Sequence, residues 1–370
     1  MDVRRRRMLV ASLAAITVSA CSNGARADDV EMRRERLREA LRQRREARGS
    51  QIPVDIDTTR IADSRAQRGP FTPIQIEDVW SDAARGGRTV PWRAYLPQNA
   101  RGLSPVVIYS HGGGGTRASG ASYGEHIASH GFVSLHLQHA GSDRDAFRNN
   151  PQQISEAARN PAQGAPRFLD VLFAYQQLQG LADGTLASAI DKTAVGIAGH
   201  SLGAITTQIA AGQVVTGFEQ TLAVPALKGA IALSPSPPRA LYGDEQTAFS
   251  RMFMPLFHMT GTLDDAPNGD FEAPARRIPF DRISNVDQWL MILEGANHFT
   301  FGGDSNPQLR GQSFGYPALP RHHDLIKVGA LAFWRWTLKR DANERAFLDR
   351  GGFQSLLARG DTFEARGARQ

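Results

Sequence analysis

The sequence predicts an α/β fold, with a mostly parallel, doubly wound sheet flanked by helices. From about residue 70 to residue 350, short apolar runs of strand length alternate with stretches whose apolar residues recur at helical spacing. The apolar runs are largely unbroken, as expected of parallel strands that helices cover on both faces. Glycine, histidine, serine and aspartate follow directly after several of these runs, where open α/β sheets place their functional loops. We therefore expect one domain over residues 70–350.

The positions of the expected elements follow from this apolar pattern. Residues 71–80 and 88–96 are expected to form two early antiparallel strands. Later runs of strand length are 105–109, 132–137, 194–198, 229–233, 254–259 and 289–293. Helical spacing links Phe168, Leu172, Tyr175 and Leu178, and later Leu325, Val328, Ala332 and Trp336. Residues 351–370 are expected to form a C-terminal tail.

The positive charge of the chain is concentrated in its first fifty residues. The chain has 43 basic and 37 acidic residues, of which residues 1–50 contain 13 and 7, so the other 320 residues contain 30 of each. The body is therefore neutral, and we do not expect it to bind nucleic acid. Cys21 is the single cysteine, which excludes an intramolecular disulfide framework and a thiolate metal cluster.

Residues 1–27 have the pattern of an export signal. Arg4 to Arg7 precede the apolar stretch from Met8 to Ala20, whose 13 residues are fewer than the roughly 20 that span a bilayer. The residues ending at Cys21 resemble a bacterial lipobox, in which the cysteine is lipidated and tethers the protein to a membrane. Ala25-Arg26-Ala27 instead fits ordinary cleavage before Asp28. We expect an exported protein. It is either a lipoprotein of the periplasm or outer membrane or a secreted form, and the sequence leaves open which of the two cleavage sites is used.

Residues 28–69 are expected to form a charged tether and linker. Glu31 to Arg48 is almost continuously charged, and Leu37 and Leu41 are too few for a coiled-coil seam. A nucleic-acid or anionic-lipid arm is the alternative, but no aromatic residues lie between the arginines, and the glutamates can pair with them within a helix. We therefore interpret this segment as a solvated tether.

The strongest chemical signal is Gly199-His200-Ser201-Leu202-Gly203. It directly follows the expected strand 194–198 and precedes a helix-compatible stretch. A nucleophile elbow needs this context, because a tight strand-to-helix turn holds the serine in a strained conformation above the sheet. Glycines two residues before and after the serine remove the Cβ atoms that would collide there. Ser201 is therefore the expected nucleophile.

A serine at its normal pKa needs a base, and the base needs an acid that orients it. In folds of this type these residues follow the serine in the order Asp or Glu, then His. The strand at 254–259 is followed by Asp264 and Asp265, and the strand at 289–293 is followed by His298. His298 is the expected base, whereas the pattern by itself leaves both aspartates open as the acid.

The glycine run after the strand at 105–109 is expected to help bind an oxyanion. Ester hydrolysis passes through an anionic tetrahedral intermediate, whose oxygen needs two backbone N–H donors. One donor is expected from Leu202, the residue after the nucleophile, and the other from Gly113. A phosphate cradle and a flexible linker are the alternatives for such a run. The G-K-[ST] ending and the G-x-G-x-x-G pattern of a phosphate cradle are both missing, and the end of a strand is an unusual place for a linker.

These motifs resemble the α/β-hydrolase superfamily, near its dienelactone-hydrolase-like and platelet-activating-factor-acetylhydrolase-like esterases. The resemblance covers residues 70 to 350 and is carried by five segments: 109–114, 128–133, 199–203, 261–265 and 295–299. It implies the α/β-hydrolase fold, Ser201 as nucleophile, His298 as base and Asp264 as acid, with no metal and no cofactor.

We therefore expect a serine carboxylic-ester hydrolase that acts on a small to medium ester through an acyl-enzyme. A serine peptidase or amidase on the same fold is one alternative. A catalytically inactive, hydrolase-like envelope lipoprotein that binds a ligand is another. The expected partner is a small-molecule ester, and the sequence leaves the oligomeric state open.

Overall fold

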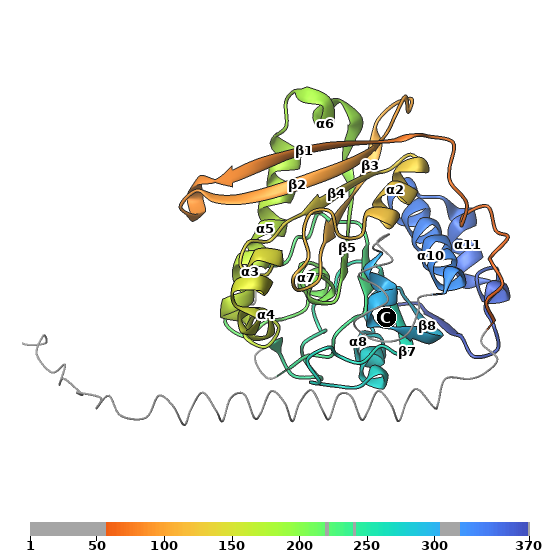
Figure 1. Ribbon diagram of the computed structural model, residues 1–370. Coiled ribbons are helices and arrows are strands. Elements are labelled where there is room, and N and C mark those ends of the chain that lie inside the picture. Colours follow the sequence, from red (N-terminus) through yellow and green to blue (C-terminus); the bar gives the residue numbers. More distant parts are fainter. Residues whose placement is uncertain (1–56, 219–221, 240–241, 304–318, 369–370) are drawn as a thin grey trace, which may run out of the picture. The chain divides into compact units, whose positions relative to one another are not determined.

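The computed structural model describes residues 57–218, 222–239, 242–303 and 319–368. The expected export signal, Cys21 and most of the charged tether lie outside these residues. In the described part, nine strands form one sheet in the order β1-β2-β4-β3-β5-β6-β7-β8-β9 (Figure 1). The sheet carries every motif that the sequence singles out for chemistry.

The strands lie within a few residues of the apolar runs that predict them, apart from the last strand. They are β1 Pro73–Asp82, β2 Arg88–Pro97, β3 Ser104–Ser110, β4 Val133–Leu137, β5 Ile190–His200, β6 Ala230–Leu233, β7 Leu256–Leu263, β8 Gln288–Asn297 and β9 Thr362–Arg366.

The helices occupy the connections between strands and the C-terminal part of the chain. The α-helices are α2 Ala121–Ser129, α3 Arg144–Asn149, α4 Pro151–Ala157, α5 Pro161–Gly180, α6 Gly184–Ala189, α7 Leu202–Ala210, α8 Ile278–Arg282, α10 Pro320–Lys339 and α11 Ala342–Asp349. Short 3₁₀ helices are η1 Ala83–Arg85, η3 Ala273–Arg277, η4 His298–Gly302 and η5 Gln354–Leu356. None of the described helices is both long and apolar enough to cross a lipid bilayer.

The centre of the sheet is parallel and its edges are antiparallel. Strands β4, β3, β5, β6, β7 and β8 pair in parallel, whereas β1, β2 and β9 are antiparallel to their neighbours. This arrangement confirms the expected fold class, including the early antiparallel pair. Because the parallel strands point the same way, the residues that follow β3, β5, β7 and β8 emerge at one edge of the sheet.

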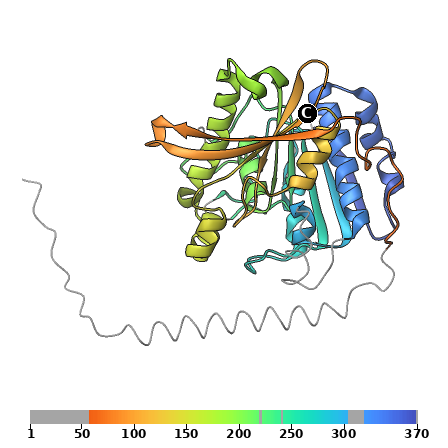
Figure 2. The same ribbon diagram turned by 45° about the horizontal axis from the view of Figure 1, so that its top comes forward.

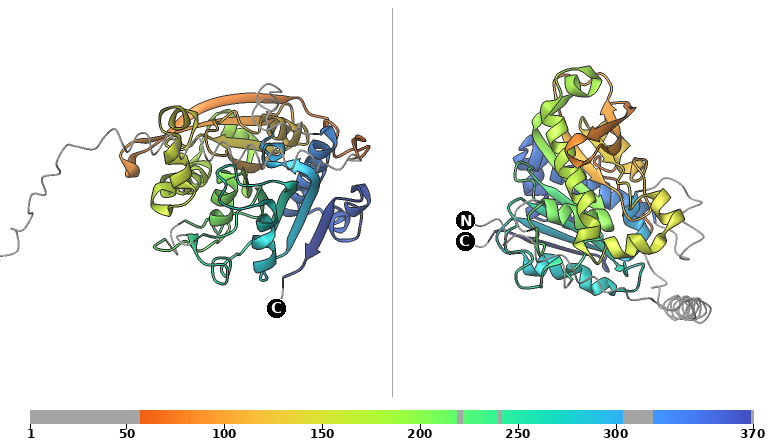
Figure 3. Two further views of the ribbon diagram at one scale, coloured as in Figure 1. Left: turned by 60° about the horizontal axis from the view of Figure 1, so that its bottom comes forward. Right: turned by 90° about the vertical axis from the view of Figure 1, so that its left-hand side faces the viewer.

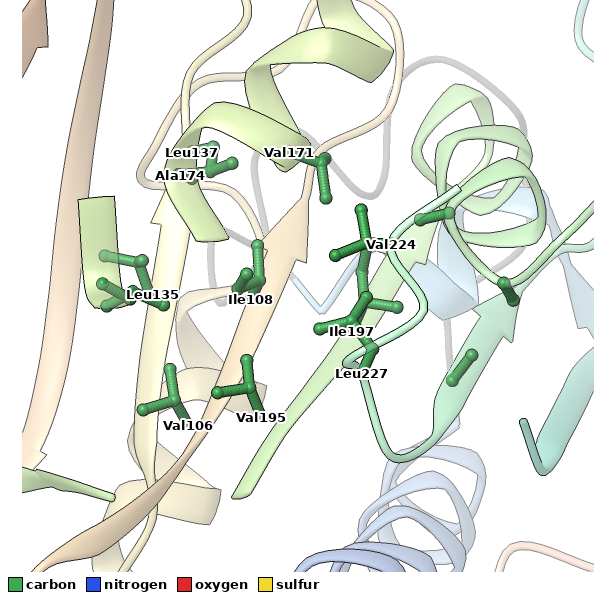
Figure 4. Packing of buried hydrophobic residues seen from close by; sticks show 14 of the residues in the cluster. Val106, Ile108, Leu135, Leu137, Val171, Ala174, Val195, Ile197, Val224 and Leu227 are labelled. Atoms are coloured by element: carbon green, nitrogen blue, oxygen red, sulfur yellow. The ribbon is translucent and has the colours of Figure 1, made fainter. Parts of the chain in front are cut away.

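Helices bury both faces of the sheet. Along β3, Val106 and Ile108 join the core cluster under α5, while Val107 and Tyr109 join the cluster under α10. This alternation follows from the two-residue period of a strand. Figure 4 shows the first cluster at close range, and Figure 2 shows the two helical layers on either side of the sheet. Burial on both faces explains why these strands have unbroken apolar sequences.

The sheet and its packing extend beyond residues 70–350. Strand β9 lies in the segment expected as a tail and pairs with β8 at the sheet edge (Figure 3). Before residue 70, Ile61 and Ala66 are buried in the cluster under α10. The side chain of Arg60 pairs with Asp324 of α10 at 2.5 Å. The sequence shows neither extension, because β9 is only partly buried and has no apolar run, and two isolated apolar residues form no pattern.

Candidate active site

The turn between β5 and α7 holds Ser201 in a strained conformation. Its φ of 59° and ψ of −117° lie in a region that L-residues rarely adopt, at a cost of about 1–3 kcal/mol. The turn is held by hydrogen bonds, since the Ser201 N–H donates to the Leu233 carbonyl at 3.0 Å and the Ser201 carbonyl accepts from Ala204 N–H at 2.8 Å. The strand-to-helix turn expected for a nucleophile is thus present.

The glycines on both sides of Ser201 are required by close packing. A Cβ atom on Gly199 would lie 2.2 Å from the Gly203 carbonyl oxygen. A Cβ atom on Gly203 would lie 1.9 Å from the Ser110 carbonyl oxygen. Both neighbours are backbone atoms, so a side chain at either position would displace the main chain. The same contact places the end of β3 directly against the start of α7.

Ser201, His298 and Asp264 are joined by an unbroken series of hydrogen bonds. The His298 Nε2 atom lies 2.8 Å from Ser201 Oγ, and His298 Nδ1 lies 2.7 Å from Asp264 Oδ1. Asp264 is fully buried after β7, and His298 is nearly buried after β8. Three residues that are far apart in the sequence therefore meet at one edge of the sheet.

The structure distinguishes the two aspartates that the sequence pattern leaves open. Asp264 contacts His298, and its second oxygen accepts a hydrogen bond from the Thr260 hydroxyl at 2.8 Å. Asp265 instead accepts from the Ala273 N–H at 2.9 Å, at the start of η3. Adjacent side chains leave the backbone in different directions, so only one of the two can face the imidazole.

His298 is held in place by the first turn of η4. The Asn297 side chain accepts hydrogen bonds from the backbone N–H groups of Phe299 and Thr300, and the Thr300 hydroxyl accepts one from the Asn297 N–H. Such a reciprocal capping box fixes the first turn of a helix. The imidazole therefore leaves a rigid turn rather than a free loop.

The glycine loop after β3 packs beside Ser201. A Cβ atom on Gly112 would lie 3.3 Å from Ser201 Cβ, and one on Gly113 would lie 2.4 Å from Ile154 Cγ2. Gly114 N–H donates to the Ser142 carbonyl at 2.9 Å. Within the described part of the chain, the backbone N–H groups of Gly113 and Leu202 have no hydrogen-bond acceptor. These are the two N–H groups that the sequence predicts for an oxyanion hole.

Comparison with known proteins places the chain in a family. Cutinase 1 of Thermobifida cellulosilytica is 32% identical over 238 residues, which are 63% of this chain and 74% of the cutinase. The chain belongs to the α/β-hydrolase superfamily of serine esterases. Cutinase of Thermobifida fusca (strain YX) is also 32% identical over 238 residues, 63% of this chain and 64% of that cutinase.

A family model agrees with this assignment over a shorter range. Residues 79–164 of this α/β-hydrolase match the model for platelet-activating factor acetylhydrolase, isoform II. The matched range includes the glycine loop but ends before Ser201. The expected superfamily and the expected class, a carboxylesterase-type serine hydrolase, are both confirmed.

Two buried arginines beside the site of this α/β-hydrolase were not found from the sequence. Arg276 in η3 and Arg167 in α5 are each about 98% buried or more. An arginine on a short or amphipathic helix is normally exposed, and only the position of its neighbours shows that it is buried. The sequence carries no local signal for either residue.

Arg276 is in contact with both Asp264 and His298. Its Nε atom lies 2.8 Å from Asp264 Oδ1, and its Nη2 atom lies 3.0 Å from His298 Nδ1. Its Nη1 atom donates to the carbonyls of Ser234 and Pro235, at 2.9 and 3.0 Å. The His298 Nδ1–H donates to the closer Asp264 oxygen, so Arg276 acts on the imidazole as a neighbouring charge.

These contacts set the charge of the acid and of the imidazole. Burial would raise the pKa of Asp264, but Arg276 and His298 together hold that pKa below its ordinary value. Burial lowers the pKa of His298, the bond to Asp264 opposes this change, and the Arg276 charge adds to it. Neutral imidazole beside an ionised carboxylate is the state that can accept a serine proton.

Proposed function

We propose that Ser201, His298 and Asp264 are the catalytic triad of this esterase and that it hydrolyses small to medium carboxylic esters through an acyl-enzyme. One observation carries the proposal. The strained turn presents Ser201 Oγ to His298 Nε2 at 2.8 Å, and His298 Nδ1 is in turn 2.7 Å from a buried carboxylate. A nucleophile, a base and an orienting acid are the groups that acyl transfer needs.

The reaction follows from these distances. His298 Nε2 takes the proton of Ser201 while Oγ attacks the ester carbonyl. The protonated imidazole then gives this proton to the departing alcohol, which leaves an acyl group on Ser201. Water attacks the acyl group with His298 again as base, the bond between the acyl carbon and Oγ breaks, and the imidazolium returns its proton to Oγ as the carboxylic acid is released. Asp264 holds the imidazole tautomer and remains ionised throughout.

Leu202 and Gly113 are the proposed oxyanion donors. Both have backbone N–H groups without an acceptor in the described part of the chain, on segments that pack against each other. Loss of one such donor typically lowers turnover by ~10²–10³. Accurate placement of the glycine loop against α7 is therefore a requirement of the mechanism.

Apolar side chains beside the site favour an ester with an apolar part. Ile154 lies against Gly113, and Phe147 lies against Gly114 while 56% of it stays exposed. Phe299 packs edge-on against the His298 ring at 5.7 Å between ring centroids and is 39% exposed. Exposed aromatic surface next to a nucleophile gives an acyl or alcohol group a place to bind.

A fluorophosphonate probe tests the assignment of the nucleophile. Attack by a serine on phosphorus expels fluoride and leaves a stable phosphonyl adduct. We expect the adduct on the peptide that contains Ser201, and no adduct in the Ser201→Ala variant. An unlabelled wild-type protein would favour the inactive, ligand-binding alternative. A matched ester and anilide with the same acyl group distinguish an esterase from a peptidase or amidase, and we expect the ester to be cleaved faster.

The pH profile tests the role of Arg276. Activity requires neutral His298, so kcat/KM falls as this imidazole is protonated on the acid side. The groups that face His298 are Asp264, Arg276, Ser201 and His200. Burial lowers the pKa of His200 to about 3, so His200 is neutral and Arg276 is the cation in contact with the His298 imidazole. Arg276→Met removes a charge that lowers the pKa of His298. We therefore expect the acidic limb of the profile to move to higher pH.

Arg277→Met provides the matched control for this pH measurement. Arg277 is the next residue, but its side chain is more exposed and pairs with Asp281 and Glu364. Its removal is expected to leave the acidic limb in place. An unchanged limb in Arg276→Met would contradict the proposed effect of Arg276 on the imidazole.

We also propose that the protein is exported and that Cys21 is lipidated, which would tether the esterase to a membrane. The support is the sequence of residues 1–27, which lie outside the described residues. Cleavage before Cys21 and cleavage before Asp28 leave mature N-terminal peptides of different mass. Mass spectrometry of the mature protein therefore distinguishes a lipoprotein from an ordinary secreted form.

A further inference from the structure

Arg167 in α5 is a buried cation that contacts no carboxylate. Only 2% of the residue is exposed, and in the part of the chain that the structure describes no Asp or Glu oxygen lies within ion-pair distance of it. Burial lowers the pKa of this guanidinium to about 9, which still leaves it charged at neutral pH. A buried charge is costly unless its surroundings compensate it. Its contacts therefore need an explanation.

The guanidinium donates to four neutral oxygens on three separate segments. It donates to the Thr206 hydroxyl at 2.8 Å, to the Ser142 and Ser110 hydroxyls at 2.9 Å each, and to the His111 carbonyl. Ser110 and His111 lead into the glycine loop. Thr206 lies in α7, and its hydroxyl donates to the Leu202 carbonyl at 3.0 Å. One side chain thus contacts both segments that carry the proposed oxyanion donors.

A second series of hydrogen bonds holds the side chain of Ser110 in place. Ser110 Oγ lies 3.0 Å from His139 Nε2, and His139 Nδ1 lies 3.1 Å from Asp170 Oδ2. All three residues are fully buried. Burial lowers the pKa of His139 to about 4, so this imidazole is neutral and its Nδ1–H donates to Asp170. Two further arginines, Arg85 and Arg88, pair with the same carboxylate.

The direction of each hydrogen bond in this network follows from these states. His139 Nε2 carries no proton, so it accepts from the Ser110 hydroxyl. That hydroxyl oxygen is then free to accept from Arg167. In the same way, the Ser142 and Thr206 hydroxyls accept from Arg167 and donate to backbone carbonyls. Every hydroxyl is used once as donor and once as acceptor, and buried hydrogen-bond networks with paired groups of this kind are rigid.

We propose that Arg167 is a positioning residue that holds the glycine loop and the start of α7 in the geometry of the oxyanion hole. This inference rests on the proposed function. The guanidinium is planar and its N–H groups point in fixed directions, so it can orient several acceptors at once. The burial cost of the charge is offset by the four oxygens that converge on it and by the negative charge of Asp170 nearby. Without this cation the glycine loop would lose the hydrogen bonds that link it, through one side chain, to Thr206 of α7.

Arg167→Met, assayed with an ester and its thiono analogue, tests the proposal. In the thiono analogue sulfur replaces the carbonyl oxygen, and the larger sulfur anion accepts hydrogen bonds weakly. The wild-type oxyanion hole therefore favours the ester. We expect Arg167→Met to lower kcat for the ester by about 10²-fold, similar to loss of one donor, with KM little changed. The rate for the thionoester should fall less. The ratio of the ester rate to the thionoester rate is therefore expected to fall by about 10-fold or more.

Arg321→Met is the matched control. Arg321 in α10 is also buried and donates to the backbone carbonyls of Thr59 and Leu356, although it also pairs with the carboxylates of Asp57 and Asp361. Its loss is expected to lower thermal stability and to leave the ester-to-thionoester ratio unchanged. A ratio that also stays unchanged in Arg167→Met would show that Arg167 only supports the fold, and would overturn the proposal.

Thr206→Val keeps the test decisive if Arg167→Met does not fold. Valine has nearly the shape of threonine but removes one of the four acceptors. In this variant the ratio of the ester rate to the thionoester rate is expected to fall by less than in Arg167→Met. An unchanged ratio would contradict the inference. A wild-type protein that hydrolyses neither substrate would instead refute the proposed function, and the positioning role with it.

Discussion

Replacement of Ser201 by alanine is expected to lower kcat for p-nitrophenyl acetate by about 10⁶-fold, because no acyl-enzyme can then form. The residual rate would come from substrate binding and from the oxyanion donors alone. Thermal stability should stay near that of the wild type, since Ser201 is a half-buried residue and alanine keeps the backbone of the turn. Initial rates and a thermal melt measure the two effects separately.

Ser188→Ala is the control for this measurement. Ser188 is an exposed residue of α6, and its hydroxyl donates to the carbonyl of Thr185 in its own helix. Its removal is expected to leave both kcat and the melting temperature unchanged. If Ser201→Ala kept more than about a hundredth of the wild-type rate, the nucleophile would have to be another residue.

Asp264→Asn is expected to lower kcat by about 10⁴-fold. An asparagine can present its NH₂ group to His298, which favours the tautomer whose Nε2 already carries a proton and cannot accept one from Ser201. This variant also leaves the Arg276 charge buried without its carboxylate partner, so its melting temperature should fall as well. The rate must therefore be measured well below the melting temperature of the variant.

Asp265→Asn distinguishes the two adjacent aspartates. Asp265 accepts a hydrogen bond from the Ala273 N–H, which an asparagine oxygen can also accept. Its kcat is expected to stay within about twofold of the wild type, because the imidazole Nδ1 is bonded to Asp264. A large loss in Asp265→Asn together with a small one in Asp264→Asn would reverse the proposed assignment of the acid.

Much of the fold could be predicted because the sheet is covered on both faces. Strand β3 is buried at every residue and is an unbroken apolar run from Pro105 to Tyr109, so it is visible in the sequence. Strand β9 escaped prediction for the opposite reason. It is an edge strand of mixed polarity, and its pairing with β8 is a long-range contact that no local pattern records.

The part of the candidate site that could be predicted is the part whose geometry depends on the few residues of one turn. The glycines around Ser201 are needed because a Cβ atom at 199 or 203 would strike the backbone, so the requirement is visible within five residues. The choice between Asp264 and Asp265 is different. It depends on which side chain faces His298, and that residue belongs to the next strand of the sheet.

The sequence by itself determined the parallel α/β architecture, the elbow at Ser201 and the order of the residues that serve it. These features depend on hydrophobic period and on turn sterics, which act over a few neighbouring residues. Only the tertiary structure decided which aspartate meets the imidazole and that Arg276 and Arg167 are buried behind the site. An arginine can be buried only where oxygen acceptors from distant segments come together around it. The packed fold sets the positions of these oxygens, and the residues beside the arginine in the sequence do not.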